Sequence, residues 1–365
     1  MICKVPSVSL NISSQGYINL CCEAPFYHIK HIDEIDDLES FFNFSVMDYY
    51  NKNKEDSCVK CLEKIDAGTE TFKTRIEKYF VFPRENLDKK ARSVGMNVPI
   101  RHLEFTLSNI CNQTCAMCSS FYSNKWQELD KKFINAGRKI HPLTKLSDTA
   151  ISKIEKILYG LDYIELKGGE PFADIKNFRI LKKLVEVNPK CTVHIITNMQ
   201  RITPEAMSII KQLPNTKLFA SIDGTHKIYD WIRDGNFDKT VKTMEHYYNE
   251  TGNTIQIGTT ISLYNFFNLL DIQDYFSDKK YIHNIVFDNW VQNLANGAPD
   301  LLGKEVYNEQ ISKYQKTLKN FTPKKYTIPY DKNYNHKINF DILNKHRGFN
   351  LLDHVPQLKE WYNQC

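Results

Sequence analysis

The sequence lacks a long hydrophobic run. Its first twenty residues, where a secretion signal would lie, are interrupted by the polar side chains of Lys4, Asn11, Ser13 and Gln15. A signal peptide or a membrane span needs an unbroken apolar stretch, so we expect neither, with no membrane partner and a cytoplasmic location. In that reducing compartment the ten cysteines would be thiols or metal ligands and not disulfides.

The sequence also lacks an internal repeat, a low-complexity tract and a strong excess of one charge. Lys and Arg number 48 against 43 Asp and Glu, a net charge of +5, which is too small for a dedicated nucleic-acid-binding protein. We therefore expect no nucleic-acid partner. Seven Lys, Arg and His side chains between Lys125 and Lys145 leave an acidic peptide or a nucleotide open as a substrate.

What the sequence does contain is a close set of three cysteines, Cys111, Cys115 and Cys118, in the run Cys-Asn-Gln-Thr-Cys-Ala-Met-Cys. A cubic iron-sulfur cluster needs a ligand at each of its four irons, and thiolate is the usual one. Three thiolates therefore leave one iron open. The alternative is zinc with a histidine as fourth ligand; the loop itself holds no histidine, and the nearest are His102 and His141.

This CxxxCxxC spacing resembles that of the radical S-adenosylmethionine (radical SAM) enzymes. A second segment, Tyr163 to Pro171, reads as a short apolar strand that ends in Gly168, Gly169 and Glu170. In the family this segment binds the methionyl ammonium of SAM, so the resemblance implies that these three residues supply carbonyl and carboxylate acceptors. The alternative is an ordinary turn after a strand, but its position after the cysteine loop, with a helical stretch between, favours the family interpretation.

Two later strand ends agree with this resemblance. In related enzymes an asparagine or serine at these strand ends contacts the SAM ribose, which implies this role for Asn198 and Ser221, and Arg233 is a candidate for the SAM carboxylate. Met117 occupies the position that usually packs against adenine. The run Ser-Ile-Asp-Gly that begins at Ser221 is typical of the branch that modifies peptides.

Strands and helices alternate through the centre of the sequence. Because such alternation implies parallel strands joined by right-handed crossovers, we predict an α/β fold, and the resemblance implies the partial (β/α)6 TIM-like barrel of radical SAM enzymes over residues 96–300. The active site should lie at the carboxyl ends of the strands. The predicted strands begin near Leu103, Tyr163, Thr192, Lys217, Thr254 and Asn284, and the predicted helices cover about residues 147–160, 176–187, 204–213, 237–250 and 266–277.

Polar side chains alternate with apolar ones on the first strands. Parallel strands that are buried on both faces should be apolar throughout, yet Glu104 and Lys167 lie on the first and second strands. We predict that these two residues line a substrate pocket. The alternative is that the ionisable side chains pair with one another as a structural network.

A second cysteine set precedes the barrel. A hairpin is expected between Leu10 and Leu20 with Gly16 in its turn. Cys3 and Cys21 lie at its two ends, and Cys58 and Cys61 form a CxxC.

This pattern resembles the twitch domain, a shortened SPASM module that binds one auxiliary 4Fe-4S cluster. It implies a small α+β domain over residues 1–95 with Cys3, Cys21, Cys58 and Cys61 as ligands. Structural zinc is the open alternative, because spacing does not separate the two metals. The neighbouring Cys22 is expected to pack as a small apolar residue.

Residues 301–365 are expected to form a C-terminal extension. A helix is predicted from Glu305 to Leu318 and a last helix near Pro356 to Tyr362, with irregular structure between them. Cys191 opens an apolar strand and is expected in the core. The terminal Cys365 is interpreted as a bystander and not as a hydrogen-atom donor.

The resemblance implies a complete function. A 4Fe-4S cluster on Cys111, Cys115 and Cys118 would bind SAM, and an electron from a flavodoxin- or ferredoxin-type donor would cleave it to a 5′-deoxyadenosyl radical that abstracts a substrate hydrogen. The favoured substrate is a peptide or protein side chain. A small polar substrate such as a sugar or nucleotide is the first alternative, and a non-catalytic iron-sulfur or zinc protein is the second.

Overall fold

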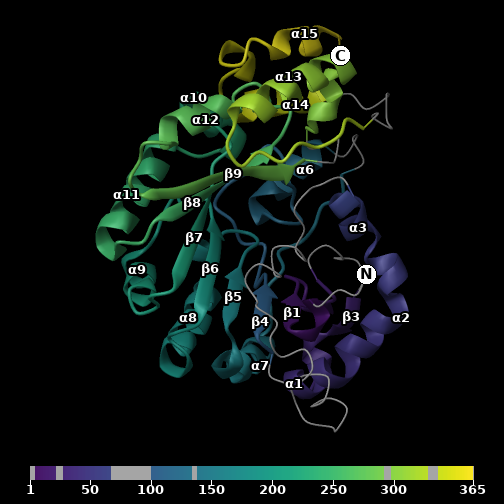
Figure 1. Ribbon diagram of the computed structural model, residues 1–365, viewed down its shortest axis with the longest axis vertical. Helices are drawn as coiled ribbons and strands as arrows, with labels where there is room; N and C mark the ends of the chain where they lie inside the picture. Colours follow the sequence, from purple (N-terminus) through teal and green to yellow (C-terminus); the bar gives the residue numbers. More distant parts are fainter. Residues whose placement is uncertain are drawn as a thin grey trace. The chain divides into compact units, whose positions relative to one another are not determined.

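Strands and helices alternate along most of the chain in the computed structural model (Figure 1), which describes residues 5–21, 28–66, 100–133, 138–291, 297–327 and 336–364. The strands are β1 (Ser9–Ile12), β2 (Tyr17–Asn19), β3 (His28–His31), β4 (His102–Phe105), β5 (Tyr163–Leu166), β6 (Thr192–Thr197), β7 (Thr216–Ser221), β8 (Ile255–Ile261) and β9 (Ile282–Trp290). The helices are α1 (Leu38–Phe41), α2 (Met47–Ser57), α3 (Val59–Asp66), α6 (Gln127–Lys132), α7 (Asp148–Ile157), α8 (Ile175–Val187), α9 (Pro204–Ile210), α10 (His226–Arg233), α11 (Phe237–Thr251), α12 (Leu269–Phe276), α13 (Lys304–Thr317), α14 (His336–Arg347) and α15 (Leu358–Gln364).

The chain divides into two units. The first contains the described residues of Met1–Ser108, Thr144–Ile195 and Pro204–Thr216, and the second those of Asn109–Leu143, Ile196–Thr203 and Lys217–Cys365. Each unit contributes its own run of paired strands, and the units are described separately below.

The sheet of the first unit joins the N-terminal strands to the central ones. β1 pairs with β4 in parallel, β4 with β5 and β5 with β6 also in parallel, whereas β2 pairs with β1 and with β3 antiparallel. Figure 1 shows α7 and α8 beside β4, β5 and β6. The α7 helix begins where expected, since the Ser147 hydroxyl accepts a hydrogen bond from the Ala150 amide at 2.9 Å and caps the first turn.

The second unit contains β7, β8 and β9, which pair in parallel and in that order. The helix α11 connects β7 to β8 after α10, and α12 connects β8 to β9. The chain is thus an α/β protein with a mostly parallel sheet, as the alternation of elements predicts. Closure of the strands into a partial barrel stays a prediction.

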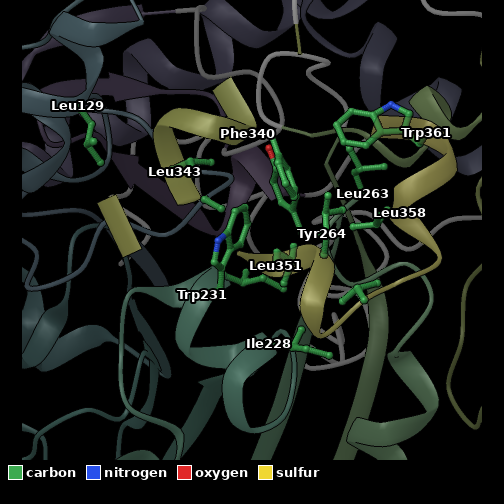
Figure 2. Close-up of a cluster of buried hydrophobic side chains, with 14 of the residues drawn as sticks. Leu129, Ile228, Trp231, Leu263, Tyr264, Phe340, Leu343, Leu351, Leu358 and Trp361 are labelled. Carbon is green, nitrogen blue, oxygen red and sulfur yellow. The ribbon is translucent and has the colours of Figure 1, made fainter. Parts of the chain in front are cut away.

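An aromatic-rich core lies in the second unit (Figure 2) and ties the C-terminal helices to it. The Phe340 side chain of α14 is fully buried. Its ring centroid lies 5.4 Å from that of Trp231 on α10 and 5.8 Å from that of Trp361 on α15. Burial of such large rings contributes a major part of the free energy of folding. The C-terminal segment is therefore an integral part of this core.

Replacement of Phe340 by alanine tests this packing. Loss of a buried aromatic ring leaves a cavity, and we expect the free energy of unfolding to fall by about 3–5 kcal/mol in urea titrations. Ile338→Ala, on the same helix but 53% exposed, is the matched control and should change it by less than about 1 kcal/mol. Equal losses in the two variants would contradict the assignment of α14 to the core.

The C-terminal region departs from the expected pattern. α13 and α15 agree with the predicted helices, but α14 occupies part of the stretch for which irregular structure was expected. Asparagine, histidine and aspartate lower the helix propensity of α14, and tertiary packing of its buried face overrides that preference. The helix α10 was likewise not expected. No described helix combines the length and the apolarity that a membrane crossing requires.

Candidate functional site

The cysteine loop belongs to the second unit. Residues outside the loop form hydrogen bonds with its backbone. The Trp126 indole donates to the Cys115 carbonyl at 3.0 Å, and the Asn124 side chain accepts from the Cys111 amide at 2.9 Å. The Ala116 amide donates to the Ile232 carbonyl at 2.7 Å. These bonds fix a loop that has no regular secondary structure of its own.

A cation that lies against two aromatic rings supports the far end of the loop. The Arg138 guanidinium lies 4.9 Å from the Trp126 ring centroid and 4.7 Å from that of Phe133, and it donates to the Cys118 carbonyl at 3.0 Å. It also lies 3.3 Å from the buried Asp130 carboxylate, which accepts from the Ser120 amide at 2.7 Å. Paired and packed in this way, Arg138 fixes the loop after its last cysteine.

The three thiols of this loop are half-buried and close enough to affect one another. Burial raises the pKa of the Cys118 thiol, and the neighbouring Cys115 and Cys111 raise it further. Burial also raises the pKa of Cys115, while the guanidinium groups of Arg233 and Arg347 act against this shift. Three crowded thiols can become thiolates together when metal cations neutralise them.

Arg233 lies directly beside the loop. Its Nη1 is 3.6 Å from the Cys115 Sγ, and its Nε is 2.5 Å from the buried Asp223 carboxylate. Burial lowers the pKa of Arg233, but the Asp223 carboxylate and the Cys115 thiol together raise it above its usual range. Asp223 is itself held by the Thr260 amide at 2.7 Å. A permanent positive charge therefore stands next to a predicted cluster ligand.

Removal of that carboxylate tests the pair. Asp223→Asn leaves the Arg233 charge without its buried partner, and we expect the free energy of unfolding to fall by about 3 kcal/mol in urea titrations. Asp274→Asn, at an exposed position of α12, should change it by less than about 0.5 kcal/mol. If the two variants unfold at the same urea concentration, the pair contributes nothing measurable.

Asn198 also reaches the cysteine loop. Its side-chain NH2 group donates to the Asn112 side-chain oxygen Oδ1 at 2.7 Å, and its own Oδ1 accepts from the Gln200 backbone amide at 3.0 Å. Ser221 ends β7 and is half-exposed. Met117 is partly buried and packs against the aromatic-rich core. The second unit thus places Asn198 and Arg233 at the cysteine loop, whereas their predicted contacts with SAM stay predictions.

The glycine segment lies in the first unit. Gly168 and Gly169 have φ values of +78° and +48°, and a Cβ at Gly168 would overlap the Thr106 side chain. Only glycine fits this backbone without strain. Glu170 is 3% exposed and accepts a hydrogen bond from the Phe172 amide at 3.1 Å. Because neither glycine carries a side chain, a ligand can approach the backbone of this segment closely.

The ionisable side chains on the first strands pair with one another. Lys167 forms an ion pair with Glu104 and lies 3.9 Å from Glu165, and the Glu165 carboxylate lies 3.1 Å from the His194 Nδ1. Glu104 and Glu165 face each other in register on β4 and β5, and both are nearly fully buried. This pairing favours the structural network over the substrate pocket for these residues.

A comparison with protein families identifies the central domain of the chain. The sequence model of the Radical SAM superfamily matches residues 105–276, a range that contains the three cysteines and the glycine segment. The chain carries a radical SAM domain. A radical SAM domain over these residues agrees with the prediction from the cysteine spacing.

Several known proteins are similar to it. The radical SAM cyclopropyl synthase TigE of Paramaledivibacter caminithermalis is 26% identical over 220 residues, which cover 55% of this chain and 43% of TigE. SuiB of Streptococcus suis, solved with S-adenosylmethionine, has 14% identity and a TM-score of 0.39 over 84% of this chain and 67% of SuiB. A SuiB structure with its precursor peptide SuiA gives 14% identity and a TM-score of 0.41 over 96% of this chain and 69% of SuiB.

A further similar structure is anSMEcpe with bound AdoMet, with 15% identity and a TM-score of 0.42 over 60% of this chain and 58% of anSMEcpe. The chain spans less than half the length of TigE and less than two thirds of anSMEcpe. The superfamily assignment therefore covers the domain, and the activity of the whole protein is a matter for proposal.

The donor set of the radical SAM domain fits a cluster that lacks one protein ligand. The loop offers three soft thiols, which suit iron-sulfur clusters, and positive groups at Arg233 and Arg347 balance their charge. In the described parts of the chain, no three His, Cys, Asp or Glu side chains already surround one metal-sized point. The cysteines would have to turn toward the cluster as it is bound, as coupled metal binding and folding allow.

Three of the predicted auxiliary ligands fall within the described residues. Cys21 follows β2, Cys58 lies between α2 and α3, and Cys61 lies on α3; all three are half-buried. Cys3, as well as Cys22 and Cys365, lies outside the described residues. The hairpin predicted around Gly16 is present, with φ of +85° at this glycine. The auxiliary cluster itself stays a prediction.

Sequence reasoning missed several residues that hold the loop. Arg347 and His346 at the end of α14 and Asp234 after α10 all contact Thr114 or lie beside it. Arg347 follows Thr114 by 233 positions, and no local pattern connects residues so far apart. Only the packing of α14 against α10 brings them together.

Proposed function

We propose that this protein reductively cleaves S-adenosylmethionine and uses the resulting radical to remove a hydrogen atom from a peptide or protein side chain. Cys111, Cys115 and Cys118 would hold a 4Fe-4S cluster. The observation that carries this proposal is the cysteine loop itself, with three half-buried thiols on a backbone fixed at both ends inside a radical SAM domain.

When bound, the cluster and SAM would together supply an electron, an open iron and a 5′-deoxyadenosyl group for hydrogen abstraction. The chain's own residues would bind and orient these groups. Gly168 and Gly169 would offer backbone carbonyls to the methionyl ammonium, and the Glu170 carboxylate would add negative charge. Asn198 and Ser221 would hold the ribose.

Arg233 would bind the carboxylate of SAM. Its guanidinium is anchored on Asp223 and held beside Cys115, so it would present a fixed cation to the carboxylate of SAM. Fixed charges in a buried site act more strongly than mobile ones. Met117 would pack against adenine.

The proposal of a peptide substrate depends on the run Ser221 to Gly224. Its aspartate, Asp223, is buried and bound to the Thr260 amide, so this run shapes the end of β7. Ser-Ile-Asp-Gly is typical of peptide-modifying relatives. A sugar or nucleotide substrate would leave the roles of the cysteine loop unchanged.

Cys3, Cys21, Cys58 and Cys61 would hold an auxiliary 4Fe-4S cluster. This cluster would accept an electron from the substrate radical or stabilise the N-terminal region. A flavodoxin- or ferredoxin-type protein would supply electrons to the first cluster. An iron-to-protein ratio near eight per chain, against near four after Cys58→Ala and Cys61→Ala, would distinguish two clusters from one.

Isotope transfer tests the substrate class. Reconstituted protein is incubated without oxygen with SAM, a reductant and deuterated candidate peptides or sugars. Deuterium in 5′-deoxyadenosine from a peptide would support the proposal. Deuterium from a sugar alone would replace the peptide by a small polar substrate, and an absence of 5′-deoxyadenosine under all conditions would refute the radical chemistry.

A further inference from the structure

The last turn of α14 reaches the cysteine loop of the same unit. α14 packs through Phe340 into the aromatic-rich core, and the side-chain oxygen Oδ1 of its Asn344 accepts a hydrogen bond from the Trp231 indole at 2.9 Å. Gly348, with φ of +76°, ends the helix directly after Arg347. Arg347 is thereby fixed at the helix C-terminus, where a positive charge is favourable.

The Arg347 guanidinium holds the loop by a multiple contact. Its Nε donates to the Trp231 carbonyl at 2.7 Å and its Nη1 to the Thr114 hydroxyl at 2.9 Å, and its Nη2 donates to the Thr114 carbonyl. Its side chain is only 2% exposed. Thr114 directly precedes Cys115, so the planar guanidinium fixes the backbone from which that thiol projects.

Asp234 and His346 complete the contact. Asp234 has a left-handed backbone with φ of +52°, and its carboxylate accepts from the Thr114 hydroxyl at 2.5 Å and lies 3.3 Å from the Arg347 Nη1. The His346 Nε2 lies 3.3 Å from the same hydroxyl. A strained backbone held by several polar partners is typical of a site that the surrounding structure positions.

We propose that Arg347 is a positioning residue for the radical SAM cluster, which clamps the backbone at Thr114 so that Cys115 is presented as a ligand. The C-terminal segment therefore does more than extend the fold, because it completes the wall of the cysteine loop. The role of Arg347 in presenting a cluster ligand rests on the proposed function. The contacts between Arg347 and Thr114 do not depend on it.

The clamp has a measurable consequence in the full-length chain after iron removal. Arg347→Gln removes the charged fork, and the loop thiols should react with iodoacetamide about tenfold faster, because charge-assisted hydrogen bonds that restrain the loop are lost. Loss of the positive charge also raises the pKa of the Cys115 thiol and slows its reaction, so Arg347→Lys, which keeps that charge, separates the restraint from the pKa effect. Cys191, which is 2% exposed in the first unit, reports general unfolding and should keep its rate. Mass spectrometry of the separate peptides gives both rates from one sample.

Two further variants sharpen the comparison. Lys345→Gln removes an exposed positive charge from the same helix and should leave both rates unchanged. Arg347→Lys keeps the charge but lacks the planar fork, so its loop thiols should react at an intermediate rate. If Arg347→Gln does not accumulate as folded protein, the thiol reaction rates of Arg347→Lys and Lys345→Gln are compared instead, and this comparison alone tests the clamp.

Iron release gives the second readout. From reconstituted protein, Arg347→Gln should lose iron to a chelator about tenfold faster than Lys345→Gln, within the range known for residues that orient metal ligands. Unchanged reactivity of the loop thiols, or an equal rise at Cys191, would overturn the clamp. If wild-type protein binds no iron-sulfur cluster, the proposed function fails, while the thiol reactivities still decide the clamp.

Discussion

Cys115→Ala is expected to abolish formation of 5′-deoxyadenosine from SAM, with a loss of more than about a hundredfold. In the proposed function Cys115 is the middle one of the three cluster ligands, and a cluster held by only two thiolates should not persist through purification. Reconstituted protein should accordingly lose the iron of one cluster and its brown absorbance. Liquid chromatography of anaerobic reactions with dithionite measures the product.

Cys191→Ala is the matched control for this loss. Cys191 is a buried cysteine, and burial together with the nearby Asp162 raises its pKa to about 12, but it lies in the first unit, directly before β6. Its replacement should leave 5′-deoxyadenosine formation within a factor of about two. Cys115→Ala protein that keeps wild-type turnover would remove the loop from the chemistry.

Gly168→Ala should combine a fold defect with a binding defect. A residue with a side chain is strained at the φ of +78°, and its Cβ would overlap Thr106. We expect the free energy of unfolding to fall by about 2–5 kcal/mol. Urea titration measures this loss, and isothermal titration of SAM into reconstituted protein should show weaker binding.

Two variants separate strain from overlap at this position. Gly252 has a similar φ of +73° but open space around it, so Gly252→Ala should lose only the strain, about 1 kcal/mol. Thr106→Ser in the Gly168→Ala background removes the methyl group that meets the new Cβ and should recover part of the loss. Equal losses for Gly168→Ala and Gly252→Ala would show that Thr106 imposes no constraint.

The sequence predicts the α/β architecture because the signals for it are local. Alternating apolar runs and caps such as Ser147 mark where strands and helices begin, and the parallel pairing follows from the crossovers. α14 escaped prediction for the opposite reason. Its residues have weak helix propensity, and Phe340 forms the helix by packing against residues more than a hundred positions earlier.

The same distinction applies to the site. The three cysteines, the predicted metal ligands, are visible in sequence because they lie close together within one loop. The residues that hold this loop, such as Trp126 and Arg347, cannot be recognised from a local sequence pattern, because their contacts with the loop form only after folding. Glu104 and Lys167 are an intermediate case, since alternation reveals them on one strand face while only coordinates show that they pair with each other.

Electron paramagnetic resonance of the reduced protein, with and without SAM, tests whether the three cysteines of the loop hold a cluster with an open iron. The Cys58→Ala and Cys61→Ala double variant leaves only the cluster of Cys111, Cys115 and Cys118 to be observed. An iron that no side chain occupies should bind SAM, so we predict a reduced 4Fe-4S signal whose g values shift when SAM is added. A signal that SAM leaves unchanged, or zinc in place of iron at these cysteines, would contradict it.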